Sequence, residues 1–478
     1  MVFVKELTVG ALTREAARPQ WVREHPWAPW AAVGAVCLGA FMGQLDASIV
    51  TLTYPRLQSE FGAGLGGVQW VSLSYLVILA VLLVPVGRWS DARGRKLLYL
   101  YGFGLFALAS AACALAPTLG WLVVARGFQA VGAALLQANS VALVVLSVPR
   151  SRVRAAIGVQ AAAQAVGLAL GPSLGGALVD LYGWRSVFWV NVPIGLSAIL
   201  IGRVLLPRSR NLRQPQGGDP AGVALLATAV GSGLLALSGL SGMPLPPATV
   251  AALGVIAVAA AMMFWRVEGR IDAPLLDIKL VRWGGQGAKL AGALLAYLLL
   301  FAPLVLYPTI FSTWGVSATV GGVALSCLPI GFALAAVGAN VLHLRASNRL
   351  RVTVGAFGVF ACVMTMTLLW RSPILVAAAL LLMGAFLGLA IPANNAALMA
   401  EVRASSSAAA GGMVNVARTL GTSLGVAVTA LGLHLANQHH LAGPQVVLGA
   451  LAVVSIALAA TTLSRPTTPA LSKTRSAR

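Results

Sequence analysis

One acidic residue lies deep inside a long apolar stretch of this sequence. Asp46 belongs to the run that begins near Trp30, and no other of the 12 acidic residues is placed so far inside such a run. A carboxyl group removed from water keeps its proton until water or a cation reaches it. Asp46 is therefore a candidate proton carrier. The alternative is a hydrogen bond that packs two helices together.

Two arginines also lie within apolar runs, Arg126 and Arg418. At a helical rise of about 1.5 Å per residue, Asp46 and Arg126 both lie roughly 10–12 Å below the same boundary, so a direct pair or a shared water network can form. Arg126 would favour ionised Asp46 and exchange partners as protons move, unless it only binds backbone carbonyls. Arg418 is equally expected to pair with an anionic group of the substrate or to form hydrogen bonds with neighbouring amides.

Several amide side chains lie at a similar depth in the apolar runs. Most amides at such a depth form hydrogen bonds between helices, and only a minority is expected to face a cavity. Together with Arg418, the candidates for substrate binding are Gln129, Gln137, Asn139, Gln164, Asn394 and Asn415.

The elements that carry these side chains are predicted to be membrane-spanning helices. Of the 478 residues, 59% are hydrophobic and only 9% are charged, against about 25% charged in soluble domains. A spanning helix needs about 20 apolar residues. Runs of this kind lie near 30–54, 68–86, 97–117, 119–146, 155–179, 186–206, 220–240, 248–265, 290–311, 319–342, 352–370, 373–399, 406–433 and 445–463. The chain is therefore predicted to be an all-α membrane protein with 14 transmembrane helices.

The distribution of basic residues orients these helices. With the N-terminus inside, 28 of the 33 Lys and Arg residues fall in inside segments and three fall in outside segments. This asymmetry predicts that both termini are cytoplasmic, in a multi-pass protein of the cell's plasma membrane. The net charge of +21 is spread over short clusters between the apolar runs, which favours contact with anionic lipid over nucleic acid.

Two stretches of the sequence resemble each other at an offset of about half the chain. Residues 171–175 read Gly-Pro-Ser-Leu-Gly and residues 421–425 read Gly-Thr-Ser-Leu-Gly. The similarity favours two pseudo-symmetric six-helix bundles with a substrate site between them, although small residues recur in any membrane helix. The predicted divisions are a cytoplasmic tail at 1–29, a bundle at 30–206, cytoplasmic segments with two linker helices at 207–289, a second bundle at 290–463 and a tail at 464–478.

Four stretches in the first half form an ordered set of motifs: Leu45–Pro55, Gly87–Leu97, Ala125–Ala134 and Gly167–Gly176. In this order they resemble the major facilitator superfamily, and within it the fourteen-helix drug:proton antiporters of the quaternary-ammonium and multidrug efflux type. Residues 184–195 resemble the same branch. The resemblance implies a central cavity lined by helices 1 and 4, and export rather than import. The first motif departs from the branch at Thr51 and at residues 53–55, which concerns the substrate more than the fold.

Two of these motifs contain candidate gating residues. In the segment between helices 2 and 3, Gly87, Asp91 and Arg95 are candidates for a conformational latch, which in the family stabilises the outward-open state; for the basic residue the alternative is a plain topology signal. In helix 5, Gly171, Pro172 and Gly175 are candidates for a hinge, because small residues allow close helix approach and proline kinks a helix. The alternative for helix 5 is packing alone.

These features together predict a proton-coupled exporter of small amphipathic compounds or drugs. Monovalent cations or neutral molecules are expected to be preferred over dications, because Asp46 alone is available to neutralise a cation. An exporter of an endogenous metabolite or self-resistance pump, and a facilitative uptake carrier, remain alternatives. We expect no enzyme activity, cofactor or metal site, because no phosphate-binding loop or metal-type spacing occurs. The expected partners are a small-molecule substrate, protons and membrane lipid, with no nucleic acid, and the chain is expected to be a monomer.

Overall fold

The computed structural model describes residues 15, 18–209, 219–271, 274–276, 278, 285–341, 346–369, 371–400, 402 and 407–462. The predicted C-terminal tail therefore lies outside the described residues, and the predicted N-terminal tail is described at residues 15 and 18–29. Within the described part, every regular element is a helix and no strand occurs. A backbone in lipid must satisfy its own hydrogen bonds, and a helix does so within one segment.

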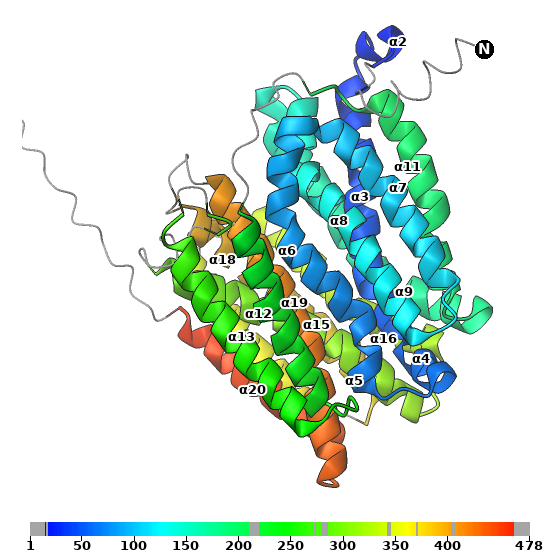
Figure 1. Ribbon diagram of the computed structural model, residues 1–478, viewed down its shortest axis with the longest axis vertical. Helices are drawn as coiled ribbons and strands as arrows, with labels where there is room; N and C mark the ends of the chain where they lie inside the picture. The colour runs from blue at the N-terminus through cyan, green and yellow to red at the C-terminus, as the bar shows by residue number, and fades with distance from the viewer. Residues whose placement is uncertain are drawn as a thin grey trace, which may run out of the picture.

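The first six spanning helices are followed in sequence by two more, and then by a second set of six (Figure 1). The first set comprises α3 (Ala28–Ile49), which continues through η1 (Val50–Thr53) into α4 (Tyr54–Phe61), then α6 (Trp70–Arg93) after the short α5 (Leu65–Val68), α7 (Arg95–Ala114), α8 (Leu119–Ser147), α9 (Val153–Tyr182) after the short η2 (Arg150–Arg152), and α11 (Asn191–Leu205) after the short α10 (Ser186–Trp189). A short helix, α2 (Gln20–Arg23), precedes this set.

The remaining helices complete the count. They are α12 (Pro220–Leu240), α13 (Pro247–Glu268), α15 (Gln286–Thr313), α16 (Ala318–Val341), α17 (Asn348–Leu368), α18 (Pro373–Ala400), α19 (Ser407–Gln438) and α20 (Gly443–Ala460). In the part of the chain that is described, 14 helical segments are long and apolar enough to cross a membrane. The predicted all-α fold with 14 transmembrane helices is therefore confirmed.

Several helices extend beyond the apolar runs that predicted them. The run near 68–86 becomes a helix that ends only at Arg93, and the run near 406–433 continues to Gln438. Polar residues at the end of a spanning helix reach the headgroup region, so the helix need not end where the apolar run ends. Gly94, with a φ of 110°, ends α6 and precedes α7 directly.

The buried apolar side chains form two large clusters. One is built mainly from α3 to α11, and the other mainly from α15 to α20. The α12–α13 pair lies beside them in Figure 1, and α12 packs against both α6 and α19. Ser238 of α12 joins this helix to the start of α6, because its hydroxyl accepts hydrogen bonds from Gln69 Nε2 and Trp70 Nε1, each at 2.9 Å.

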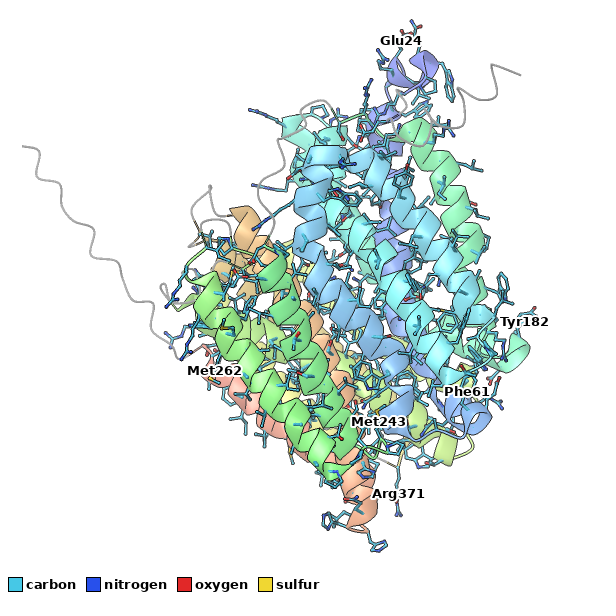
Figure 2. All side chains as sticks on the ribbon, in the orientation of Figure 1. Glu24, Phe61, Tyr182, Met243, Met262 and Arg371 are labelled. Carbon is cyan, nitrogen blue, oxygen red and sulfur yellow. The ribbon has the colours of Figure 1, made fainter. Side chains whose placement is uncertain are left out.

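The two ends of the bundle carry segments predicted to lie on opposite sides of the membrane. Figure 2 shows Glu24, from the predicted inside, and Arg371, from the predicted outside, at opposite ends of the longest axis. Successive spanning helices end at alternate ends of the bundle, which agrees with the predicted alternation of inside and outside loops. Which end faces the cytoplasm stays a prediction from the charge distribution.

Candidate functional site

The Asp46 carboxylate lies at the centre of a buried polar cluster between α3, α8 and α11. Its side chain is fully buried, and Oδ2 lies 2.6 Å from Arg126 Nη1. Oδ1 accepts hydrogen bonds from Gln129 Nε2 at 2.9 Å and from Asn191 Nδ2 at 3.1 Å. Three donors from two helices therefore satisfy the hydrogen-bonding capacity of a carboxylate that the protein has removed from water.

Arg126 has further partners besides Asp46. Its Nε donates to the Val71 carbonyl at 2.8 Å, and Nη1 also donates to Gln129 Oε1 at 2.6 Å. The guanidinium carbon lies 4.3 Å from the ring centroid of Tyr75 and 5.8 Å from that of Phe188. These carbonyl and aromatic contacts stabilise the cation independently of the carboxylate.

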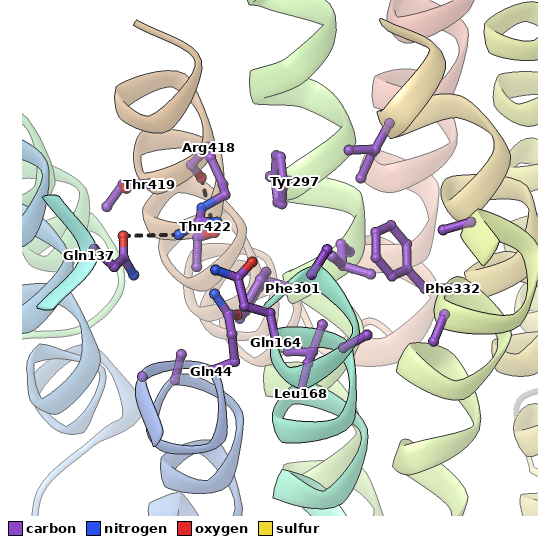
Figure 3. Close-up of a pocket in the computed structure, with 18 of the residues that line it drawn as sticks. Gln44, Gln137, Gln164, Leu168, Tyr297, Phe301, Phe332, Arg418, Thr419 and Thr422 are labelled. Carbon is purple, nitrogen blue, oxygen red and sulfur yellow. Dashed lines mark hydrogen bonds between the residues drawn. The ribbon is translucent and has the colours of Figure 1, made fainter. Parts of the chain in front are cut away.

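A cavity of about 590 Å³ lies between the two sets of six helices (Figure 3). Its lining comes from α3, α6, α8 and α9 on one side and from α15, α16, α18 and α19 on the other. The volume is in the range of small-molecule sites, about 300–1,000 Å³. The lining is mostly apolar, and its polar members are Gln44, Tyr75, Gln137, Gln164, Tyr297, Asn395, Arg418, Thr419 and Thr422.

The Asp46–Arg126 pair is adjacent to this cavity but does not line it. Gln44 and Ala47 of α3 line the cavity, whereas Asp46 on the same helix points toward α8. Residues one or two positions apart on a helix point in different directions, which explains the difference. Tyr75 separates the two regions, because it lines the cavity and its ring also contacts the Arg126 guanidinium.

The substrate-binding candidates divide into two groups. Gln137, Gln164 and Arg418 line the cavity, and Figure 3 shows the hydrogen bond from Arg418 Nη2 to Gln137 Oε1, at 3.1 Å. The other four candidates lie outside the lining. Gln129 belongs to the Asp46 cluster, and Asn139 donates to Ser90 Oγ and to the Leu135 carbonyl. Asn394 and Asn415 donate to the carbonyls of Lys289 and Gly411, respectively.

The two sets of helices are joined at one end, which we call the closed end. There Asp180, near the end of α9, accepts hydrogen bonds from the backbone of Ala318 and Thr319 at 3.3 and 2.7 Å, and from Thr319 Oγ1 at 2.7 Å. Ser173 N donates to Ser326 Oγ at 3.1 Å nearby. The carboxylate thus caps the first turn of α16 from the other half of the molecule.

The cavity reaches toward the opposite end of the same helices. Gly158, Ala161 and Ala162, in the first half of α9, line the cavity and remain exposed. The cavity is therefore accessible from the end at which α9 begins. We call this the open end; in the predicted topology it faces the cytoplasm.

The hinge candidates, which lie in α9, pack in two directions. Side chains at Gly171 and Gly175 would collide with Ser48 and Ile49 of α3, so these two glycines allow close packing within one half. Contact with the other half falls on Pro172, whose carbonyl faces Gly322, and on Gly176, which faces the first residues of α16. Gly176 was part of the motif but not among the gating candidates.

The latch candidates lie at the junction of α6 and α7. Asp91 forms an ion pair with Arg95 across the turn at Gly94. The Glu15 carboxylate accepts hydrogen bonds from the backbone of Lys96 and Leu97, at 3.0 and 3.2 Å, and so caps α7. A side chain at Gly87 would make only an ordinary 3.9 Å contact with Ala138.

Sequence reasoning missed several residues of the two regions. Asn191 is one, although it lies in the stretch 184–195 that carries the family resemblance, and a polar residue inside an apolar run was the available signal. Gln44 carried the same signal. Tyr75 carried none, since an aromatic residue in an apolar run is most often core.

Comparison with known proteins agrees with this architecture. The family model described as Major Facilitator Superfamily matches residues 36–268. Multidrug resistance protein Stp of Mycobacterium tuberculosis is 33% identical over 407 residues, covering 82% of this chain and 74% of the relative. Methylenomycin A resistance protein of Streptomyces coelicolor is 31% identical over 410 residues, covering 84% and 85%. A crystal structure of the nucleoside transporter NupG superposes with a TM-score of 0.64 at 12% identity, covering 91% of this chain and 99% of the other.

These findings place the chain among transporters rather than enzymes. Two relatives that match most of their length are named for drug or antibiotic resistance, and the solved structure shares the fold. With 14 helices able to cross a membrane, it is a multi-pass protein of the plasma membrane. The chain belongs to the major facilitator superfamily, and it is a transporter related to bacterial drug-efflux proteins.

Proposed function

We propose that this protein is a proton-coupled exporter of small amphipathic molecules. The observation that carries the proposal is the buried Asp46–Arg126 pair, which lies beside a cavity between the two halves and is separated from it by Tyr75. An ionisable pair buried at membrane depth is costly, and such groups most often serve ion or proton pathways. A substrate in the cavity and a proton on Asp46 would occupy neighbouring but distinct sites.

The contacts around the pair suit both protonation states of the carboxylate. When Asp46 is ionised, Arg126, Gln129 and Asn191 all donate to it. When it is protonated, Arg126 retains the Val71 carbonyl, Gln129 Oε1 and two aromatic rings. Asn191 Oδ1 has no hydrogen-bond partner among the described residues. It could accept the new proton of Asp46 once the amide group turns over.

Release of the proton would then follow a change in the side of the membrane to which the site is open. In the present state the halves are joined at the closed end, and the cavity is accessible from the open end. Rocking of one half against the other would expose the site to the other side in turn. We infer that Gly171, Pro172, Gly175 and Gly176 permit this movement in α9, and that Gly87, Asp91 and Arg95 restrain it at the junction of α6 and α7.

The proposed substrates differ in one respect from those expected from the sequence. The preference for monovalent cations assumed that Asp46 would face the substrate, and the carboxylate lies outside the cavity lining instead. No carboxylate is among the described residues that line this cavity. The expectation that dications are excluded is therefore retained, and the expectation that monovalent cations are preferred loses its support.

Transport in inverted membrane vesicles tests the proposed function. Biphenylcarboxamide, a neutral amphipathic probe, should accumulate in vesicles whose interior has been acidified, and a protonophore should return its uptake to the level of vesicles that lack the protein. Accumulation that does not respond to the protonophore would support a facilitative carrier instead. A gradient-dependent flux only out of such vesicles would indicate uptake rather than export.

Replacement of Asp180 by alanine should weaken the closed end. The loss of a helix cap typically costs about 1 kcal/mol, which corresponds to roughly a fivefold fall in the ratio of the closed to the open arrangement at this end. A cysteine in place of Ser326, which is 4% exposed, reports this change. In a chain whose four native cysteines are replaced by alanine, a membrane-impermeant maleimide should label Ser326→Cys about fivefold faster when Asp180→Ala is present.

The matched control for this measurement is Asp180→Asn. Its side-chain oxygen still accepts a hydrogen bond from the Thr319 amide, so labelling should stay close to that of the parent chain. Equal labelling of all three chains would show that the Asp180 contact does not hold the closed end.

A further inference from the structure

The charge of the cavity lining is positive. Among the described residues, Arg418 of α19 is the only one that lines the cavity with a formal charge at neutral pH. Asp46 does not balance it, because that carboxylate is already neutralised by Arg126 outside the lining. An arginine held at membrane depth without a nearby anion is costly, and an anion that reaches it is bound with little competition from water.

The partners of Arg418 leave part of its guanidinium available. Nη2 donates to Gln137 Oε1, and Cζ lies 5.9 Å from the ring centroid of Tyr297. Among the described residues, no carboxylate lies within ion-pair distance of it. A guanidinium has five N–H donors in a planar fork, of which the hydrogen bond to Gln137 uses one.

Amides surround the same space. Gln44 and Gln164 project into the cavity in Figure 3, and their side chains form no hydrogen bond with another described residue. Asn395 also lines the cavity, and its Oδ1 is buried without a hydrogen-bond partner. These groups provide further donors to an anion and acceptors for polar groups on the substrate.

The rest of the lining suits a flat apolar body. Tyr75, Tyr297, Phe301 and Phe332 bring four aromatic rings to the cavity, together with leucine and alanine side chains. Aromatic rings bind planar hydrophobic groups by offset stacking and edge contacts. The cavity therefore combines one fixed cation with an apolar, aromatic volume.

We propose that the preferred substrate is an amphipathic monoanion: an aromatic or otherwise apolar body that carries one carboxylate or comparably small anionic group, which Arg418 binds. This inference rests on the proposed function, since it names the substrate class of the same cavity. A cation in this place would lie beside Arg418 in a low-dielectric space with no carboxylate in the lining to balance it. A neutral molecule would fit but would leave the guanidinium without a counterion.

Three probes of the same shape separate these possibilities. Biphenylcarboxylate, biphenylcarboxamide and biphenylcarboxamidinium share one apolar body and carry a negative charge, no charge and a positive charge. Their dissociation constants are measured by calorimetry on the purified full chain in detergent at neutral pH. We expect the carboxylate to bind at least about tenfold more tightly than the carboxamide, which is typical of a charge-assisted hydrogen bond, and the amidinium to bind most weakly.

Variants at Arg418 assign the preference to this side chain. Arg418→Gln should reduce the ratio between carboxylate and carboxamide to about one, and Arg418→Lys should keep part of it. A thermal unfolding midpoint close to that of the wild type shows that the variant is folded. Arg371→Gln, which removes an exposed arginine far from the cavity, controls for the overall positive charge.

Several outcomes would overturn the assignment. They are tighter or equal binding of the carboxamide or the amidinium, a preference for the carboxylate that survives in Arg418→Gln, and failure of the carboxylate to bind the wild-type chain. None of these measurements uses a proton gradient. A loss of proton coupling in vesicles would therefore contradict the proposed transport mechanism and leave the charge preference standing, and the reverse also holds.

Discussion

Replacement of Asp46 by asparagine is expected to eliminate the component of transport that depends on a pH gradient. An asparagine has nearly the shape of the aspartate but cannot bind and release a proton in this way. The cavity lining is unchanged by the substitution, because Asp46 is not part of it. Uptake of biphenylcarboxamide into inverted vesicles should therefore fall to the level seen with a protonophore, while its binding in detergent persists.

The structural cost of this substitution has to be separated from its functional effect. Removing one partner of a buried ion pair typically costs about 3–5 kcal/mol, because the other charge is left unpaired. Arg126 keeps two carbonyl acceptors and two aromatic contacts, which reduces that cost. The double variant Asp46→Asn/Arg126→Gln removes both charges and should recover most of the lost stability, as judged by the thermal unfolding midpoint.

The double variant should fold and bind substrate but remain unresponsive to the pH gradient. The control is Glu60→Gln, which removes the carboxylate of a half-exposed ion pair with Arg185 at the end of the first spanning helix. Its gradient-driven uptake should be close to that of the wild type, since exposed pairs contribute little. Gradient-driven uptake at the wild-type rate in Asp46→Asn would exclude this carboxylate as the proton carrier.

The fold was largely predictable from the sequence because the membrane imposes it. A helix that crosses the apolar layer needs a run of fixed minimum length, and such runs are visible without any knowledge of packing. The ends of the helices were less predictable. The continuation of α3 through η1 into α4, and the extension of α6 to Arg93, depend on residues in the headgroup region, where apolar and polar side chains are both tolerated.

The ion pair and the cavity differed in how well the sequence indicated them. Asp46 and Arg126 are rare residues for their depth, and their equal distance from one boundary indicated that they could meet. The amides gave no comparable information. A spanning helix is apolar toward lipid and toward its neighbours alike, so its sequence does not mark the side that faces a cavity. Asn139 and Asn394 therefore looked equivalent to Gln137 and Gln164, although only the glutamines line the cavity.

Replacement of Gly176 by valine is expected to prevent the closed end from forming. A Cβ atom at this position would lie 2.6 Å from the carbonyl carbon of Ala318 and 2.9 Å from Thr319 Cα, closer than Cβ atoms approach other heavy atoms. Both are backbone atoms of a helix that cannot move alone, so α9 and α16 would have to separate. Overpacking of this kind costs about 1–3 kcal/mol, which corresponds to roughly a 5- to 150-fold fall in the ratio of the closed to the open arrangement at this end.

Two measurements should change together in Gly176→Val. The impermeant maleimide should label Ser326→Cys roughly 5- to 150-fold faster than in the parent chain, an effect at least as large as that of Asp180→Ala. Gradient-driven uptake should fall by a similar factor, because a transporter that cannot close one end cannot complete its cycle. Gly449→Val is the matched control, since no neighbouring part of the described chain lies within 4 Å of a Cβ atom at that position of α20.

The result also distinguishes a hinge from plain packing in α9. If the glycines serve packing alone, Gly176→Val should lower the thermal unfolding midpoint while Ser326→Cys stays protected in the chains that remain folded. If Gly176 allows the two halves to meet, the folded chains should themselves be labelled faster. The contact between Gly322 and the Pro172 carbonyl lies between the same two helices, so Gly322→Val should show the same pattern of labelling and uptake.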